Sequence, residues 1–154
     1  MSHHREHLPK TPTVTLVARL LLAFSALLSA VGGAIHAAAF RRTLAAVATS
    51  NLSPFFGNSF MVLWLEDSCI LFILAAVFGY IAVRPSAATK PVAVLLALIP
   101  AATAVLLYIF LGGFFAGHLL LAVAAMAFFA GLRFPAQVEA EAMTVKGPSS
   151  AMDI

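Results

Sequence analysis

Two adjacent carboxylates, Glu66 and Asp67, lie within an apolar run that begins at Phe60 and continues to Val83. Ionisable groups are costly in hydrocarbon, so those found within membrane-spanning helices usually face protein partners and mark a functional site. Because consecutive residues of a helix point about 100° apart, we expect one carboxylate to line a site and the other to pair with a neighbouring segment. The candidate partners are His36, His118, Tyr108 and Arg42.

These polar residues fall at similar distances from the ends of their apolar runs. At the helical rise, His36 and His118 lie roughly 7 Å inside those ends, and Tyr108 lies roughly 6 Å inside. Glu66 and Asp67 lie roughly 10 Å inside the start of their own run. If consecutive helices alternate in direction, all of these side chains reach the same leaflet. The sequence therefore predicts one polar site in the outer leaflet of a membrane.

Metal binding is one chemistry that suits these residue types. Two histidines and a carboxylate can form a facial triad for iron or, with water, a zinc or manganese site. Two histidines on separate helices can also hold a haem through its axial positions. A transition metal or haem is therefore the candidate cofactor. The candidate metal ligands are His36, His118, Glu66 and Asp67, and Tyr108 joins the two histidines as a candidate cofactor-binding residue.

A metal-free use of the same residues is the second possibility. A histidine–carboxylate pair in a low dielectric can shuttle protons or polarise the carbonyl of a quinone or lipid. Glu66 or Asp67 would then be the catalytic carboxylate. A purely structural use is the third, in which the acids join helices and each histidine bonds to a backbone carbonyl or a serine. The chain contains no HExxH, GxSxG, P-loop or CxxC motif, so the site hypothesis depends on depth alone.

The amino-acid composition indicates that the chain lies in a lipid bilayer. The 154 residues are 62% hydrophobic and 10% charged, with a mean hydropathy of +1.03. A soluble domain of this size cannot bury that much apolar surface, so the bilayer must solvate it. The formal net charge is +3, but the basic residues are scattered at the ends of apolar runs, which excludes a nucleic-acid partner. The single cysteine, Cys69, excludes an intrachain disulfide and a multi-cysteine metal site.

The apolar runs predict an all-α, four-helix transmembrane bundle with up-down-up-down topology. A spanning helix needs about 20 apolar residues, and each run approaches or exceeds that length. We expect a single four-span membrane domain at 14–133, between a polar cytoplasmic tail at 1–13 and a disordered cytoplasmic tail at 134–154. The expected spans are 14–40, 60–83, 91–111 and 114–132, with an outer loop at 41–59.

Basic residues predict the orientation. Arg41 and Arg42 flank the expected outer loop, and all other lysines and arginines lie in the two terminal flanks and the middle linker. By the positive-inside rule, the N- and C-termini should both be cytoplasmic. We expect a multi-pass protein of a plasma membrane, the bacterial inner membrane.

Small residues recur at a spacing of four in the first expected span, at Ser25, Ser29, Gly33 and Ala37. Small side chains at that spacing let a neighbouring helix come close. We therefore expect this face of the helix to be tightly packed.

Two main functions fit these patterns. The first is a small integral membrane protein whose His/carboxylate site binds a metal, haem or an amphipathic ligand such as a quinone or lipid, with redox or proton-transfer activity if it is an enzyme. The second is a non-catalytic accessory subunit that packs against a larger membrane complex. A proton-coupled carrier is a third, which would need a homo-oligomer because four helices leave little room for a pathway. The sequence is compatible with both an enzyme and a non-enzyme.

Overall fold

The computed structural model describes residues 14–135, and every element within that range is helical. Each of its 4 α-helices is long and apolar enough to cross a membrane. The elements are α1 (Leu16–Ala48), α2 (Pro54–Val83), the short 3-10 helix η1 (Pro85–Ala87), α3 (Lys90–Leu111) and α4 (Phe115–Leu132). The expectations for 1–13 and for 136–154 lie outside the described residues.

The segment 41–59, expected to be a loop, is mostly helical. Helix α1 continues to Ala48 and α2 begins at Pro54, so the connection is only 49–53. An alanine-rich run carries α1 forward, and the Thr43 hydroxyl donates to the carbonyl of Ala39 one turn earlier, at 3.3 Å, so this polar side chain does not interrupt the helix. Pro54 is tolerated at the first position of α2, where its missing N–H has no intrahelical partner.

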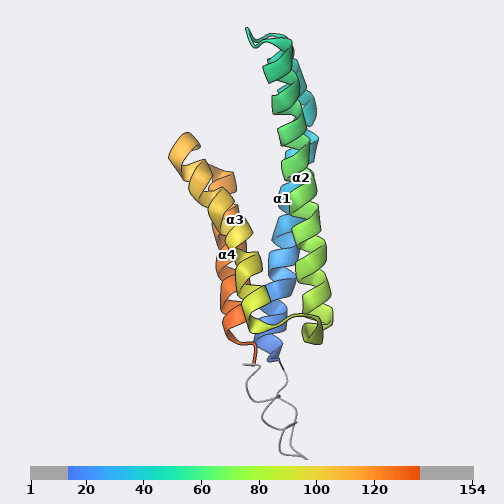
Figure 1. Cartoon of the computed structure of the whole chain (residues 1–154), viewed down its shortest axis with the longest axis vertical. Helices are drawn as coiled ribbons and strands as arrows, with labels where there is room; N and C mark the ends of the chain where they lie inside the picture. The colour runs from blue at the N-terminus through green and yellow to red at the C-terminus, as the bar shows by residue number, and fades with distance from the viewer. Residues whose placement is uncertain (1–13, 136–154) are drawn as a thin grey trace, which may run out of the picture.

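The first two helices are therefore much longer than the last two. Helix α1 has 33 residues and α2 has 30, whereas α3 has 22 and α4 has 18. At the helical rise these lengths are about 50, 45, 33 and 27 Å. The tip of the α1–α2 hairpin, which we define as residues 41–63, consequently extends beyond the α3–α4 turn (Figure 1).

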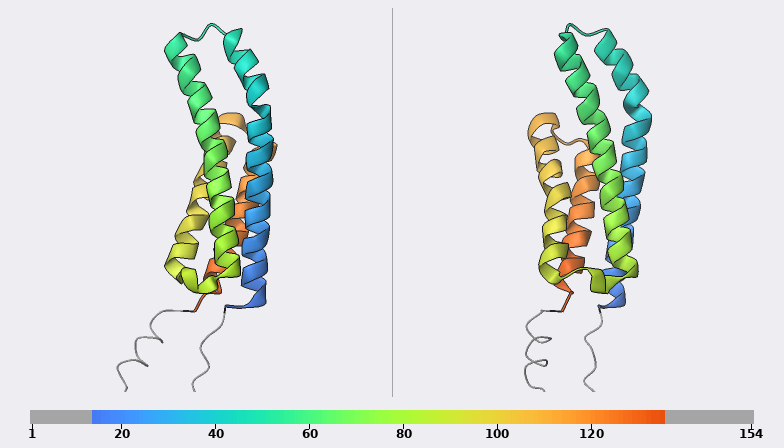
Figure 2. Two further views of the ribbon diagram at one scale, coloured as in Figure 1. Left: turned by 90° about the vertical axis from the view of Figure 1, so that its right-hand side faces the viewer. Right: turned by 45° about the vertical axis from the view of Figure 1, so that its right-hand side comes forward.

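The helices form two hairpins that are joined mainly through α1. Helix α1 packs against α2, α3 packs against α4, and α1 also packs against α4. The hairpins lie together near the two ends of the described chain and diverge toward the α3–α4 turn (Figure 1). Figure 2 shows the starts of α1 and α3 and the ends of α2 and α4 gathered at that same end.

Small residues allow the helices to approach closely. Ser25, Ser29 and Gly33 all lie on the buried face of α1, which confirms the tightly packed face expected from their spacing. The Ser25 hydroxyl lies 2.9 Å from the Leu21 carbonyl in its own helix and 3.3 Å from the Val123 carbonyl on α4, so its one proton is shared between the two acceptors. The outer faces carry large exposed apolar side chains, such as Ile73, at 62% exposure, as expected for a helix surface solvated by lipid.

Candidate functional site

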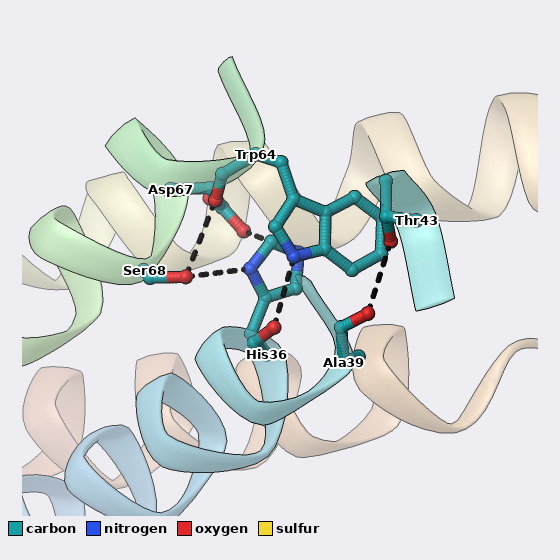
Figure 3. A network of polar contacts seen from close by, with 6 residues as sticks. All are labelled: His36, Ala39, Thr43, Trp64, Asp67 and Ser68. Carbon is teal, nitrogen blue, oxygen red and sulfur yellow. Dashed lines mark hydrogen bonds and ion pairs between the residues drawn. The ribbon is translucent and has the colours of Figure 1, made fainter. Parts of the chain in front are cut away.

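His36 is the centre of a polar cluster between α1 and α2 (Figure 3). Its Nδ1 lies 2.9 Å from Ser68 Oγ, and its Nε2 lies 3.5 Å from Asp67 Oδ2. The Trp64 ring stacks on the imidazole, with centroids 4.1 Å apart and planes inclined by 12°. The indole Nε1 also donates to the His36 carbonyl at 2.9 Å. We call these four residues the His36 cluster; they fix the imidazole by both its nitrogens and one of its faces.

Helix periodicity explains why α2 supplies three members of this cluster. Trp64, Asp67 and Ser68 are spaced by three and four residues, which places them on one face of a helix. Ser68 is buried at 4% exposure, and its hydroxyl donates to the Trp64 carbonyl at 3.2 Å. The side chains of His36 and Asp67 are 25% and 39% exposed. The cluster is therefore anchored in the hairpin but open at its edge.

The Ser68 hydroxyl can connect two protonation states of His36. A serine hydroxyl carries one proton and donates one hydrogen bond. In the first state, the Ser68 hydroxyl donates to the Trp64 carbonyl, so Nδ1 of His36 must carry a proton and donate it to Ser68 Oγ. A second ring proton on Nε2 then makes the ring an imidazolium that faces the Asp67 carboxylate. When the hydroxyl donates to Nδ1 instead, a neutral ring keeps its proton on Nε2, again toward Asp67. The two states differ by one proton and a hydroxyl rotation, so the cluster can gain or lose a proton without moving a helix.

The two adjacent carboxylates have different surroundings. Asp67 faces His36, whereas Glu66 is exposed and forms no ion pair or side-chain hydrogen bond within the described residues. The turn of about 100° between consecutive helical positions accounts for this difference. One carboxylate therefore belongs to a site and the other lies on the outer surface of α2.

Tyr108 and His118 form a second pair, between α3 and α4. The Tyr108 hydroxyl hydrogen-bonds to Nδ1 of His118, and the ring centroids lie 5.3 Å apart. Gly117 lies beside this contact, and a Cβ there would meet Tyr108 Cζ at 3.4 Å, an ordinary contact. His118 itself is exposed. No hydrogen bond or ion pair among residues 14–135 joins this pair to the His36 cluster.

The expected polar residues thus meet as two pairs instead of one group. The two pairs belong to different hairpins, and the hairpins diverge toward the α3–α4 turn (Figure 1). Within the described part of the chain, no group of three or more His, Cys, Asp or Glu side chains could hold a metal ion. Both nitrogens of His36 already have protein partners, and Nδ1 of His118 is bonded to Tyr108. This arrangement does not fit the expected four-ligand metal site or an axial haem site.

A shallow, open groove of about 330 Å³ lies next to the His36 cluster on the α1–α2 hairpin. Trp64 belongs to both, since it lines the groove and stacks on His36. The Thr43 and Ser50 hydroxyls donate to backbone carbonyls and can still accept hydrogen bonds. Aromatic and aliphatic walls with a few polar groups are typical of ligand sites. The lining residues are Thr43, Ala46, Val47, Ser50, Leu52, Phe60 and Trp64.

The comparisons with protein-family models, with curated proteins and with solved structures give no significant match. The geometry of the hairpin is therefore the basis for a functional proposal.

Sequence reasoning missed the roles of Ser68 and Trp64. It placed neither residue in the site. Their spacing from Asp67 was a usable signal, because it places all three on one helix face. The contacts of Ser68 and Trp64 with His36 could not be predicted, because the alignment of α1 against α2 depends on the length of the connection between them. That connection is 49–53, whereas the sequence suggested a loop at 41–59.

Proposed function

We propose that this chain is a multi-pass membrane protein that binds an amphipathic ligand of the quinone or lipid type on its α1–α2 hairpin. The apolar part of the ligand packs against Trp64 and Phe60 in the groove, and the Thr43 and Ser50 hydroxyls rotate away from their backbone carbonyls to donate hydrogen bonds to its carbonyl oxygens. The His36–Asp67 pair holds a proton beside the ligand. The observation that carries the proposal is the His36 cluster, a histidine–carboxylate pair whose stacked tryptophan also lines the groove.

The proposed placement is an up-down-up-down bundle with both termini cytoplasmic, in a plasma membrane such as the bacterial inner membrane. Helices α3 and α4, about 33 and 27 Å long, match a hydrocarbon core of about 30 Å. Counted from the helix ends at the cytoplasmic face, Asp67 then lies at roughly 24 Å and His36 at roughly 30 Å. The His36 cluster reaches the outer edge of the hydrocarbon, where a lipophilic ligand arrives from the bilayer and protons arrive from water.

The adjacent carboxylates provide a matched pair of variants. Asp67→Asn and Glu66→Gln make the same chemical change at neighbouring positions, but only Asp67 faces His36. Trp64 is the only tryptophan in the chain, so its emission reports on the groove directly. The full chain in lipid nanodiscs would be titrated with a short-tailed quinone and, separately, with a short-chain phosphatidylcholine.

We expect saturable quenching of Trp64 by the quinone, with an apparent dissociation constant about tenfold to a hundredfold higher in Asp67→Asn. This range corresponds to the loss of the charge-assisted contact between Asp67 and His36, about 1.5–3 kcal/mol, which holds in place the imidazole on which Trp64 stacks. Glu66→Gln should bind like the parent chain. Saturation by the phosphatidylcholine alone would identify a lipid as the ligand. Absence of saturation by both probes, or equal weakening in the two variants, would contradict the proposal.

An accessory subunit is the second candidate, favoured by the surroundings of Glu66. This carboxylate lies on an exposed apolar stripe of α2, with Val62 at 63% and Ile73 at 62% exposure. Charged residues at membrane depth usually face protein partners. Native purification should then recover a partner in fixed stoichiometry, or a homo-oligomer, which Glu66→Gln releases and Asp67→Asn retains. Recovery of the chain as a monomer in a mild detergent would exclude this function.

A further inference from the structure

One basic side chain stands near each helix end at the end of the molecule opposite the α1–α2 tip. Arg19 is near the start of α1, Arg84 follows α2, Lys90 begins α3 and Arg133 follows α4. Figures 1 and 2 show that these four helix ends converge. We call these residues the basic ring. The three arginines are exposed and Lys90 is half-buried.

The positions of the basic ring are fixed by a single apolar cluster. Ala18, Ala82, Ala93 and Phe134 are buried members of that cluster, and each lies within three residues of a ring member. Two of the ring side chains are also held by backbone carbonyls. Arg19 Nε donates to Ala82 O at 2.8 Å, and Arg133 Nη1 donates to Phe129 O at 3.1 Å. Within the described residues, the remaining N–H groups of both guanidinium groups have no hydrogen-bond partner.

No carboxylate of the described residues neutralises the ring. The acidic residues within 14–135 are Glu66 and Asp67, which lie roughly 24 Å or more from the end of α2 along its axis. The one ion pair found in that range joins Asp67 to His36. The ring is therefore a concentrated positive surface at one end of the bundle.

The apolar neighbours of the ring indicate its depth in a membrane. Leu16 is 69% exposed, Val17 51% and Val83 70%, so lipid-facing side chains lie immediately beside the cations. A ligand for this surface must combine a negative headgroup with an apolar body. Phospholipid acyl chains would contact the exposed apolar residues while the phosphate reaches the cations, as in basic sites for anionic lipids.

We propose that the basic ring binds the phosphate groups of anionic phospholipids in the leaflet on its side of the membrane. This site is independent of the groove on the α1–α2 hairpin, and its occupant is a structural lipid of the bundle. Free phosphate lacks the apolar body and binds much more weakly. Binding should weaken as salt rises, because exposed charges are screened.

The test compares two double variants of the full chain. Arg84→Gln/Lys90→Gln removes two ring cations whose side chains make no backbone hydrogen bond in the described structure. Arg41→Gln/Arg42→Gln makes the same change in net charge on α1, in the tip of the hairpin. Native mass spectrometry from zwitterionic detergent would measure binding of phosphatidylglycerol, of phosphatidylcholine with the same acyl chains, and of inorganic phosphate.

Each ring cation should contribute about fivefold, equivalent to about 1 kcal/mol, so the ring variant should bind phosphatidylglycerol about 25-fold more weakly. The control variant should stay within about twofold of the parent chain. Arg84→Lys/Lys90→Arg keeps both charges and should bind normally, which separates loss of charge from loss of folding. Equal affinity for the two lipids, equal loss in both charge-removing variants, or tighter binding of inorganic phosphate would overturn the proposal.

Discussion

Replacing Gly131 by alanine should force α3 and α4 apart. A Cβ on Gly131 would lie 3.1 Å from the backbone N of Val94 and 3.2 Å from the backbone C of Ala93. Because both are main-chain atoms, a change of rotamer cannot relieve the contact. Overpacking of this kind costs about 1–3 kcal/mol, while alanine in place of a helical glycine recovers at most about 1 kcal/mol. The variant should therefore be as stable as the parent chain or less stable.

Gly79→Ala is the matched control. Its Cβ would lie 3.8 Å from Ala26 Cβ, which is an ordinary contact. Since the gain in helix propensity applies to both variants, their difference in unfolding free energy isolates the contact with α3. We expect Gly131→Ala to be less stable than Gly79→Ala by about 1–3 kcal/mol. Reversible unfolding in mixed micelles of mild and denaturing detergent, followed by far-UV circular dichroism, would measure that difference.

A further variant sharpens the interpretation. Val94 Cγ2 also lies 3.1 Å from the added Cβ, so Val94→Ala removes a side-chain contact and leaves the two backbone contacts. The double variant Gly131→Ala/Val94→Ala should therefore regain only part of the stability lost. If Gly131→Ala proved as stable as Gly79→Ala, the close approach of α4 to the start of α3 would be refuted.

Two further predictions concern buried and interhelical hydrogen bonds. Ser25→Ala should cost about 1 kcal/mol in the same unfolding assay, because the Ser25 hydroxyl donates to the carbonyls of Leu21 and Val123. Ser29→Ala should be neutral or stabilising, because the buried Ser29 hydroxyl has no hydrogen-bond partner among the described residues; a loss equal to that of Ser25→Ala would contradict this. Tyr108→Phe should cost about 0.5–1.5 kcal/mol, and adding His118→Ala should cost little more if the two residues stabilise the α3–α4 hairpin as a unit. Strictly additive costs would show that the pair does not interact.

Much of the fold was readable from the sequence, because long apolar runs have few alternatives to spanning helices. The positions of α3 and α4 agree with the expected 91–111 and 114–132 to within one residue at each end. Segment 41–59 was misjudged because Arg41 and Arg42 end the apolar run without ending the helix. Charged residues indicate where a helix leaves the hydrocarbon of the membrane, whereas its backbone hydrogen bonds determine the residue at which the helix ends.

The candidate site was readable only in part. Asp67 pairs with His36, as one of the alternatives allowed, and Tyr108 pairs with His118. Similar depth did not bring the polar residues into one group, because depth does not specify rotation about a helix axis or the angle between hairpins. The rotation of α2 about its axis places Glu66 on the surface, and the angle between the hairpins separates the His36–Asp67 pair from the Tyr108–His118 pair. This rotation and this angle depend on packing of small residues such as Gly33, which faces Leu71 of α2, and Gly32, which faces Leu119 of α4, and the effect of such packing on geometry cannot be read from spacing alone.

The length of the α1–α2 hairpin bears on the choice between the two proposed functions. Under the proposed placement, Glu66 lies roughly 26 Å from the cytoplasmic ends of the helices, close to the outer edge of a hydrocarbon core of about 30 Å. An acid at that depth can extend to the headgroups and water, so its exposure costs far less than at the centre of the bilayer. Glu66 therefore needs no protein partner. Asp67 and Ser68, in contrast, are turned toward α1 and committed to His36, which favours a ligand site on the hairpin over a subunit interface.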